Sequence, residues 1–353
     1  MSWLSDEAIS RLQAASVLPD VSGTRYRLVE RIGSGGMGAV YLAEDSILAR
    51  RVALKVLDLP DAPGELAARL LREAHILARL EHPGIVPVHD AGTLADGRVF
   101  YAMKFVEGRR LDRVAEEMTS LPDRLRIFQR ICDAVAFAHA RGVLHRDLKP
   151  ENIMVGPFGE VLVMDWGVAK ILESRENDPE ARNPESLASL AEVFPVQPAK
   201  TAHGTVLGTP GYMAPEQARG DVESLDARAD IFSLGALLRF LLDPRPQQGT
   251  TTLDKGANAL AMASSSFSGI LFVSRPLSAI ARKAMSEDRE GRYTSTSELA
   301  LDIARYLDGL PVSAYPENIF RKVARLAGRY RVAIALVLTY LVVRAMLFFF
   351  FRR

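Results

Sequence analysis

Apolar and polar residues alternate along the early part of the chain, from Tyr26 to about residue 106. Alternation with a period of two, in runs rich in valine, tyrosine and leucine, is typical of half-buried β-strands. Residues 65–80 differ, because their apolar positions recur every three or four residues, as on one face of an α-helix. The pattern therefore predicts one helix and five strands, the strands at 26–33, 38–45, 51–58, 85–92 and 98–106.

Helical spacing dominates after Gly108. We expect helices at 124–142, 226–242, 276–285 and 295–307. A strand-rich half followed by a helix-rich half indicates an α+β fold of two lobes with a cleft between them. The expected organisation is an N-terminal extension (1–25), a small lobe with a five-stranded antiparallel sheet and one helix (26–106), and a larger, mainly helical lobe (107–309).

Composition is that of a globular protein and indicates the redox compartment of the chain. With 353 residues, 48% hydrophobic and 25% charged, the chain has the make-up of an ordinary globular protein and suits a two-lobed enzyme with appendages. Its single cysteine, Cys132, excludes an internal disulfide and agrees with a reducing compartment. No apolar run near the N-terminus suggests a signal peptide.

Charge is unevenly distributed along the chain. The net charge is +1, yet eight basic residues and no acidic one follow Glu317, so residues 1–317 carry a net charge of −7. An acidic body with a basic tail argues against nucleic acid as a partner. It suits a folded domain that leads into a membrane-facing segment.

Candidate chemistry is concentrated in HRDLKPEN (145–152) and DWG (165–167). Asp147 can accept a proton from an attacking hydroxyl, while Asn152 and Asp165 can hold magnesium against triphosphate oxygens. His145 is expected to pack rather than to act as an acid or base. A lone Asp-x-x-x-x-Asn spacing is common by chance. It becomes informative when Lys55, Glu73 and Asp165 occur with it in the expected order.

At these motifs the sequence resembles the eukaryotic-like (Hanks-type) serine/threonine protein kinases, especially the bacterial membrane-linked ones. The resemblance covers roughly residues 26–309 and implies ATP and Mg²⁺ as cofactors and transfer of the γ-phosphate to Ser/Thr hydroxyls of proteins. It also implies autophosphorylation and a second copy of the chain as a partner. Lys149 would neutralise charge on the transferring phosphate and marks a serine/threonine preference. Trp166 stands where the family usually has phenylalanine, and we expect activity to be retained.

A glycine-rich turn lies between the first two predicted strands, with Gly33, Gly35 and Gly38 in IGSGGMGAV. Glycines let backbone amides approach phosphate oxygens, although a plain hairpin turn would look the same. A strand follows the glycines, as the kinase reading requires, where a dinucleotide site would have a helix. The expected nucleotide contacts are Ile32, Gly33, Gly35, Gly38, Val40, Ala53, Lys55 and, at the hinge, Met103, Phe105 and Val106.

Lys55 stands among aliphatic residues in a predicted strand, and Glu73 follows eighteen residues later in the predicted helix. Taken singly, each could be a solvated surface charge. Together they predict an ion pair that aims the ammonium at the α- and β-phosphates.

The resemblance also assigns roles around the activation segment, 165–216. In GTPGYMAPE, Thr209 would hydrogen-bond near Asp147 and Lys149, and Glu216 would pair with Arg292. Asp230 would receive backbone hydrogen bonds from the catalytic loop, by which we mean HRDLKPEN (145–152).

The segment between these motifs is longer than usual in such enzymes. Residues 171–204 are rich in proline and charge and are expected to form a mobile insertion. We hypothesise that Thr201 or Thr205 becomes phosphorylated and docks on Arg146, which orders the loop. Residues 243–275 lack the family pattern, so substrate choice is the least transferable expectation.

The tail carries a second kind of signal. Residues 332–351 are twenty mostly apolar residues, about 30 Å as a helix, which predicts one membrane span despite Arg344. The alternative is a helix docked on the helical lobe, which would bury Arg344 without a partner. Residues 310–331 form a basic juxtamembrane segment suited to anionic lipids. We therefore expect a single-pass protein of the inner membrane with a cytoplasmic kinase domain and no external sensor domain.

Two alternatives remain open at this stage. The chain could be a pseudokinase that binds nucleotide as a scaffold, or a membrane tether whose kinase fold serves only protein interaction. The first would require loss of Lys55, Asp147, Asn152 or Asp165, and all four are present.

Overall fold

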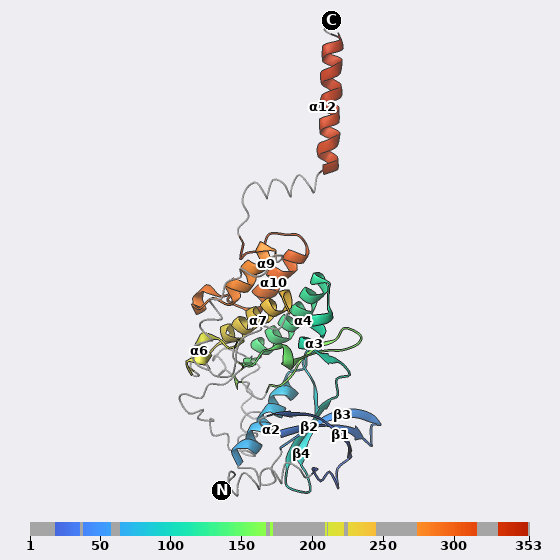
Figure 1. Cartoon of the computed structure of the whole chain (residues 1–353), viewed down its shortest axis with the longest axis vertical. Helices are drawn as coiled ribbons and strands as arrows, with labels where there is room; N and C mark the ends of the chain where they lie inside the picture. The colour runs from blue at the N-terminus through green and yellow to red at the C-terminus, as the bar shows by residue number, and fades with distance from the viewer. Residues whose placement is uncertain are drawn as a thin grey trace, which may run out of the picture.

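The computed structural model describes residues 18–35, 38–57, 64–166, 170–171, 209, 211–221, 225–244, 274–315 and 331–351. These residues form a sheet-rich N-terminal lobe and a larger helical lobe, so the predicted α+β fold of two lobes is confirmed (Figure 1).

The small lobe is a five-stranded sheet with strand order β1-β2-β3-β5-β4, in which neighbouring strands are antiparallel. The strands are β1 (Tyr26–Gly35), β2 (Gly38–Asp45), β3 (Arg50–Val56), β4 (Val88–Thr93) and β5 (Val99–Lys104). The helix α2 (Gly64–Arg79) lies against β4 and β5. All six elements were predicted, with ends that differ by a few residues.

Strand parity in β3 decides which side chains face the cleft. Val52, Leu54 and Val56 are buried in one apolar cluster of the small lobe. Ala53 belongs instead to the large cluster that continues into the helical lobe. Because successive strand residues point to opposite faces, Lys55 lies on the same side as Ala53.

The helical lobe is built around α4, which lies against α7 and α10, while α9 packs on α7. The helices are α3 (Leu111–Glu117), α4 (Leu121–Ala140), α6 (Pro215–Ala218), α7 (Ala227–Leu242), α9 (Arg275–Ala284) and α10 (Thr296–Leu307). The side chains of Ser120, Asp226 and Ser295 accept hydrogen bonds from backbone N–H groups in the first turns of α4, α7 and α10. Such caps explain why these helices begin where they do.

Several short elements, most of them around the catalytic loop (145–152), were not predicted. They are β6 (Arg109–Arg110), β7 (Val143–Leu144), β8 (Ile153–Val155), β9 (Val161–Val163), β10 (Lys170–Ile171) and the 3₁₀ turns η1 (Pro150–Asn152) and η4 (Arg289–Gly291). β6, β8 and β9 form one small sheet, and β7 pairs with β10. Runs of two or three residues are too short to show a hydrophobic period, and so is the seven-residue helix α3.

The residues that directly follow α10 remain packed against the helical lobe. Val312 is buried, and the buried carboxylate of Asp302 accepts hydrogen bonds from the backbone N–H groups of Ser313 (2.7 Å) and Ala314 (3.1 Å). The Ser313 hydroxyl (2.7 Å) and the Tyr293 hydroxyl (2.8 Å) also donate to Asp302. Residues 311–315 are therefore tied to the helical lobe.

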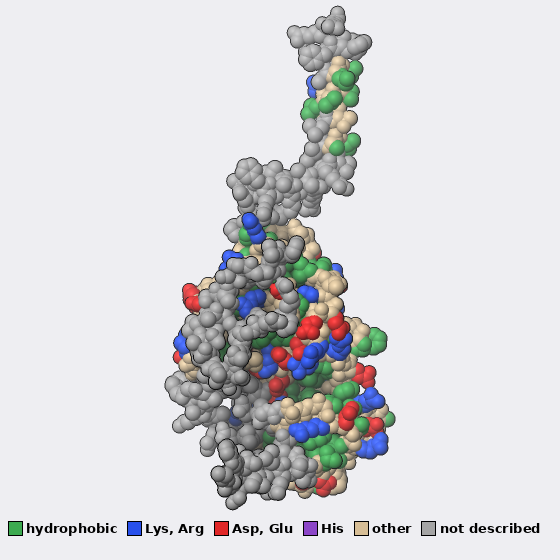
Figure 2. All heavy atoms as spheres, in the orientation of Figure 1, with side chains coloured by type: hydrophobic (Ala, Val, Ile, Leu, Met, Phe, Trp, Pro, Cys, Tyr) green, Lys and Arg blue, Asp and Glu red, His purple; other side chains and the backbone are tan. Residues whose placement is uncertain are grey.

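The helix α12 (Arg331–Phe351) stands apart from the two lobes in Figure 1. Hydrophobic side chains are visible along it in Figure 2, and those of Leu336, Tyr340 and Met346 are more than half exposed. Among the described residues, no helix has the combination of length and apolar character that defines a membrane span. The predicted transmembrane helix is therefore not shown.

Candidate active site

Lys55 and Glu73 meet at the inner face of the small lobe. The Lys55 Nζ atom lies 2.8 Å and 2.9 Å from the two carboxylate oxygens of Glu73. Glu73 occupies the buried stripe of α2 together with Leu70, Ala74 and Leu77, which is why an acidic residue of a helix points inward here. The predicted ion pair is present.

Tyr101 completes this pair, although it lies in no motif that would predict such a role. It stands opposite Lys55 in the β3–β5 register, and its hydroxyl donates to Glu73 Oε1 at 2.9 Å. Burial, followed by the charge of Glu73, raises the pKa of Tyr101 well above its usual value, so the hydroxyl stays protonated as a donor. Glu73 is thereby held from two sides.

Lys55 also reaches across the cleft. Its Nζ atom lies 3.3 Å from Asp165 Oδ1, a contact between residues 110 positions apart in the sequence. Burial alone would lower the pKa of Lys55, but the carboxylates of Glu73 and Asp165 outweigh it, and the pKa is raised. Burial likewise raises the pKa of Asp165, yet Lys55 and other nearby cations hold it below its usual value. Both groups are therefore charged at neutral pH.

The catalytic loop places Asp147 at the centre of a polar cluster. Lys149 Nζ donates to Asp147 Oδ2 at 2.7 Å and to Thr209 Oγ1 at 2.8 Å. Thr209 Oγ1 donates to Asp147 Oδ1 at 2.9 Å. The predicted contact of Thr209 with both residues is thus present, and it joins the end of the activation segment to the loop.

Asn152 and Asp165 fit the donor set that a divalent cation requires. Asn152 donates through Nδ2 to Asp147 O (2.8 Å) and Oδ2 (3.2 Å), which turns its amide oxygen away from the loop. The Asp165 side chain is 48% exposed, and it contacts Lys55 through Oδ1. An amide oxygen and a carboxylate are hard oxygen ligands of the kind that magnesium prefers. The described residues contain no cluster of three or more His, Cys, Asp or Glu side chains suited to a metal ion.

Asp230 accepts hydrogen bonds from the backbone of the catalytic loop, as predicted. It is fully buried in α7 and accepts hydrogen bonds from the backbone N–H groups of His145 (2.9 Å) and Arg146 (2.8 Å). Burial raises the pKa of Asp230, but hydrogen bonding and the charge of His139, which lies 2.7 Å away, hold it below its usual value. Its charge fixes the loop backbone.

His145 and Trp166 form the packed layer under the site. His145 is fully buried, and its Nε2 lies 3.0 Å from the backbone oxygen of Met164. The two ring centroids are 4.6 Å apart, and Trp166 donates from Nε1 to Val163 O at 3.3 Å. The structural role expected for His145 agrees with this packing, and the larger Trp166 is accommodated in the core.

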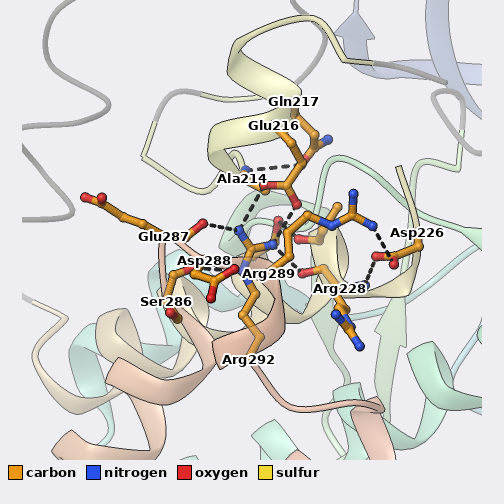
Figure 3. A network of polar contacts seen from close by, with 12 residues as sticks. Ala214, Glu216, Gln217, Asp226, Arg228, Ser286, Glu287, Asp288, Arg289 and Arg292 are labelled. Atoms are coloured by element: carbon orange, nitrogen blue, oxygen red, sulfur yellow. Dashed lines mark hydrogen bonds and ion pairs between the residues drawn. The ribbon is translucent and has the colours of Figure 1, made fainter. Parts of the chain in front are cut away.

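A buried ion pair anchors the substrate segment, by which we mean the described residues 209 and 211–218. Arg292 lies 2.6 Å and 2.9 Å from the two carboxylate oxygens of Glu216 in α6, as expected (Figure 3). Arg292 also donates to the backbone oxygens of Arg228 (2.9 Å) and Ser286 (2.8 Å). The guanidinium therefore ties the substrate segment to α7 and to the loop before η4.

The predicted nucleotide contacts line β1, β2, β3 and β5. Val40 stands opposite Lys55, and Ala53 stands opposite Met103 in the sheet register. Ile32 is 43% exposed on β1, and Gly33 and Gly35 lie at the end of that strand. Phe105 is half-buried and Val106 buried directly after β5. Val40, Ala53, Lys55 and Met103 share one face of the sheet, and the contacts of the whole set with a nucleotide stay predictions.

Of the residues in the predicted phosphorylation switch, the structure describes Arg146 but not the two threonines. Arg146 is buried and adopts a left-handed backbone conformation (φ +69°). Its Nε and Nη2 atoms have no hydrogen-bond partner among the residues that the structure describes. Thr201, Thr205, all of the expected insertion at 171–204 except residue 171, and most of the divergent stretch 243–275 lie outside the described residues.

An antiparallel sheet lobe, a helical lobe and a lysine–carboxylate–aspartate line across the cleft define a phosphotransferase of the kinase class. The chain belongs to the protein kinase family: residues 26–301 match the protein kinase domain. The family uses ATP and a divalent metal, as the sequence analysis expected.

The chain is similar to curated bacterial kinases. It is 38% identical over 305 residues to "Serine/threonine-protein kinase PknD" of Protochlamydia amoebophila, covering 80% of this chain and 30% of that protein. It is 39% identical over 311 residues to the protein of the same name from Chlamydia muridarum, covering 81% of this chain and 32% of that protein. The chain thus spans about a third of the length of these relatives. The predicted assignment to the protein kinases is confirmed by the match to the protein kinase domain.

Proposed function

We propose that this chain transfers the γ-phosphate of ATP to serine or threonine hydroxyls of proteins. The observation that carries the proposal is the continuous arrangement Glu73–Lys55–Asp165 across the cleft, with Asp147 in the adjacent loop. Lys55, held in place by Glu73, would contact the α- and β-phosphates, and Asp147 would face the attacking hydroxyl.

The chemistry follows from these positions. The substrate oxygen forms a bond to the γ-phosphorus while the bond between that phosphorus and the β–γ bridging oxygen breaks, and ADP leaves. Asp147 Oδ1 and Oδ2 already accept hydrogen bonds from Thr209 and Lys149, so the carboxylate is oriented to take the hydroxyl proton. Lys149 lies beside it to offset negative charge on the transferring phosphoryl group. We propose Mg²⁺ as the metal, held by Asn152 and Asp165, where it would neutralise the triphosphate.

Asp147→Ala tests the proposal. Purified protein should incorporate phosphate from ATP, into itself or into a Ser/Thr peptide, and the variant should be slower by about a hundredfold or more. Equal incorporation by the two proteins would reject catalysis at this site. It would instead favour the non-catalytic scaffold or tether, which no contact in the described residues specifically supports.

We also propose that phosphorylation in the activation segment regulates the enzyme. The support is the buried guanidinium of Arg146, whose Nε and Nη2 lack partners within the described part of the chain. A phosphothreonine at 201 or 205, added by a second copy of the chain, would supply the missing acceptors. Full activity in a Thr201→Ala/Thr205→Ala variant would contradict this mechanism.

Finally, we propose that the C-terminal segment attaches the kinase to the inner membrane, with the kinase domain on the cytoplasmic side. The support is the apolar sequence 332–351, the exposed apolar side chains of α12 and the basic residues before it. The full chain should sediment with membranes and a chain ending at Tyr315 should not. Extraction by alkaline carbonate would indicate attachment to the lipid surface rather than a single-pass span.

A further inference from the structure

Gln217 has an unusual position for an uncharged residue of the substrate segment. It follows Glu216 in the short helix α6, and its side chain is only 4% exposed. Both ends of its amide are used. Nε2 donates to Arg146 O at 2.9 Å. Oε1 accepts from the Ala214 N–H at 3.2 Å, and both of these residues are labelled in Figure 3. The amide therefore bridges the substrate segment and the catalytic loop.

The oxygen that Gln217 contacts belongs to the peptide unit between Arg146 and Asp147. The N–H of the same unit donates to His145 Nδ1 at 3.3 Å. Arg146 has a left-handed backbone conformation, which a residue with a side chain adopts only when its surroundings hold it there. The orientation of this peptide unit sets the direction in which Asp147 leaves the loop.

We propose that Gln217 is a positioning residue for Asp147, because it fixes the peptide unit that precedes the carboxylate and makes that fixation depend on a docked substrate segment. The segment then touches the loop at two points, Thr209 on the carboxylate and Gln217 on the backbone. Displacement of the segment would release both contacts together. The inference rests on the proposed kinase activity and adds a residue to its machinery.

The amide of Gln217 presents a donor to Arg146 O and an acceptor to the Ala214 N–H at once. Glutamate at this position retains the acceptor and loses the donor, while methionine retains similar length and loses both. A residue that merely fills space would tolerate methionine. Gln217→Glu and Gln217→Met therefore separate the hydrogen bonds from the packing.

The experiment measures peptide phosphorylation by the full chain with each variant, together with the stoichiometry of ADP binding. We expect kcat to fall roughly ten- to hundredfold, because a small displacement of a catalytic group has effects of that size. The KM for ATP and the ADP stoichiometry should stay at wild-type values. Gln129→Met, at a half-buried glutamine of α4, is the matched control and should keep the wild-type kcat.

A double-mutant comparison distinguishes positioning from general damage. In an Asp147→Asn background, Gln217→Met should lower the residual rate no further, since its effect passes through Asp147. A further loss of the same size, a wild-type kcat in both Gln217 variants, or loss of ADP binding in both would each overturn the inference. Wild-type activity of Asp147→Asn would instead reject the proposed function itself.

Discussion

At the scale of single residues, two buried carboxylates around the site are informative because each meets an opposite charge or several hydrogen bonds. Glu73 meets Lys55 and Tyr101, and Asp230 receives two backbone N–H groups. An unpaired buried charge would be costly enough to exclude such residues from a core. Buried charge here therefore marks the contacts that hold the site together.

The Glu216–Arg292 pair allows a direct test. Both side chains are almost fully buried, and Arg292 also serves two backbone oxygens. Arg292→Ala should lower the free energy of unfolding by about 3–5 kcal/mol, because it leaves a buried carboxylate unpaired. Urea titration of the two proteins measures the difference.

The nearby Arg289–Asp226 pair is the control for that measurement. Its atoms lie 2.6 Å apart, but both side chains are partly exposed (Figure 3). Arg289→Ala should cost less than about 1 kcal/mol, as exposed pairs usually do. Equal losses for the two variants would show that burial of the first pair is not what makes it important.

How far the site could be predicted depends on where its residues stand in the sequence. Lys55, Asp147 and Asp165 lie in short motifs whose spacing reflects their chemistry, so they were found without coordinates. Tyr101 and Gln217 lie in no such motif, because their roles come from a strand register and from a contact between distant segments. Only the fold brings those partners together.

At the scale of elements, strand parity and helix periodicity carried most of the prediction. Leu70, Ala74 and Leu77 repeat as the buried stripe of α2, and Val52, Leu54 and Val56 alternate in β3. The two- and three-residue strands around the catalytic loop were not predicted, because pairing with a neighbouring strand is what stabilises them. Elements stabilised by pairing alone leave no local signal.

The β1–β2 hairpin provides a prediction at this scale. Gly38 has a φ of +151°, and a Cβ placed on it would lie 2.1 Å from the backbone oxygen of Val56 in β3. Gly38→Ala should therefore force the hairpin away from β3, raise the KM for ATP several-fold and lower the melting temperature. Enzyme kinetics at varied ATP and a thermal melt check both effects.

Gly33→Ala serves as the matched control in the same hairpin. A Cβ there meets only the Val40 side chain, at 3.7 Å, which is an ordinary contact. Its melting temperature should stay close to that of the wild type. If both alanine variants behaved alike, close approach of the backbone at Gly38 would not be the limiting feature.

Asp302 links α10 to the following segment and predicts a pH dependence. Burial raises its pKa, but the hydrogen bonds from Ser313, Tyr293 and Ala314 outweigh burial and hold the pKa below its usual value. Its stabilising effect is therefore present above the unfolded pKa of about 4 and is lost as the pH falls through the lower folded value. Asp302→Asn should lower the free energy of unfolding by about 1–3 kcal/mol at pH 7. The asparagine amide places an N–H donor where the neighbouring groups, which are themselves donors, need an acceptor.

Urea titrations of the two proteins at several pH values test this prediction. The difference in unfolding free energy should be constant from pH 7 to about 5. It should shrink below about pH 4, where the carboxylate of the unfolded chain takes up a proton before that of the folded chain does. A difference that grew on acidification would contradict the assigned direction. Glu298→Gln, at an exposed residue of the same helix, is a control for the loss of one carboxylate.

At the scale of the whole molecule, a few contacts join parts that are distant in sequence. Lys55 meets Asp165 across the cleft, and Val163 N–H donates to Gly84 O at 2.8 Å between the lobes. Gln217 and Thr209 join the substrate segment to the catalytic loop. The active arrangement is therefore a property of the assembled lobes, and neither lobe contains it alone.

The end of the folded unit gives the last prediction. Val312 is buried, Ala314 and Tyr315 pack against the core, and Ser313 satisfies Asp302. A chain ending at Tyr315 should match the full chain in unfolding free energy. A chain ending at Gly309 should lose about 3–5 kcal/mol, since it exposes Val312 and strips Asp302 of three of its donors. Urea titration of both truncated proteins measures this, and equal stability would mean that residues 310–315 rest on the lobe without supporting it.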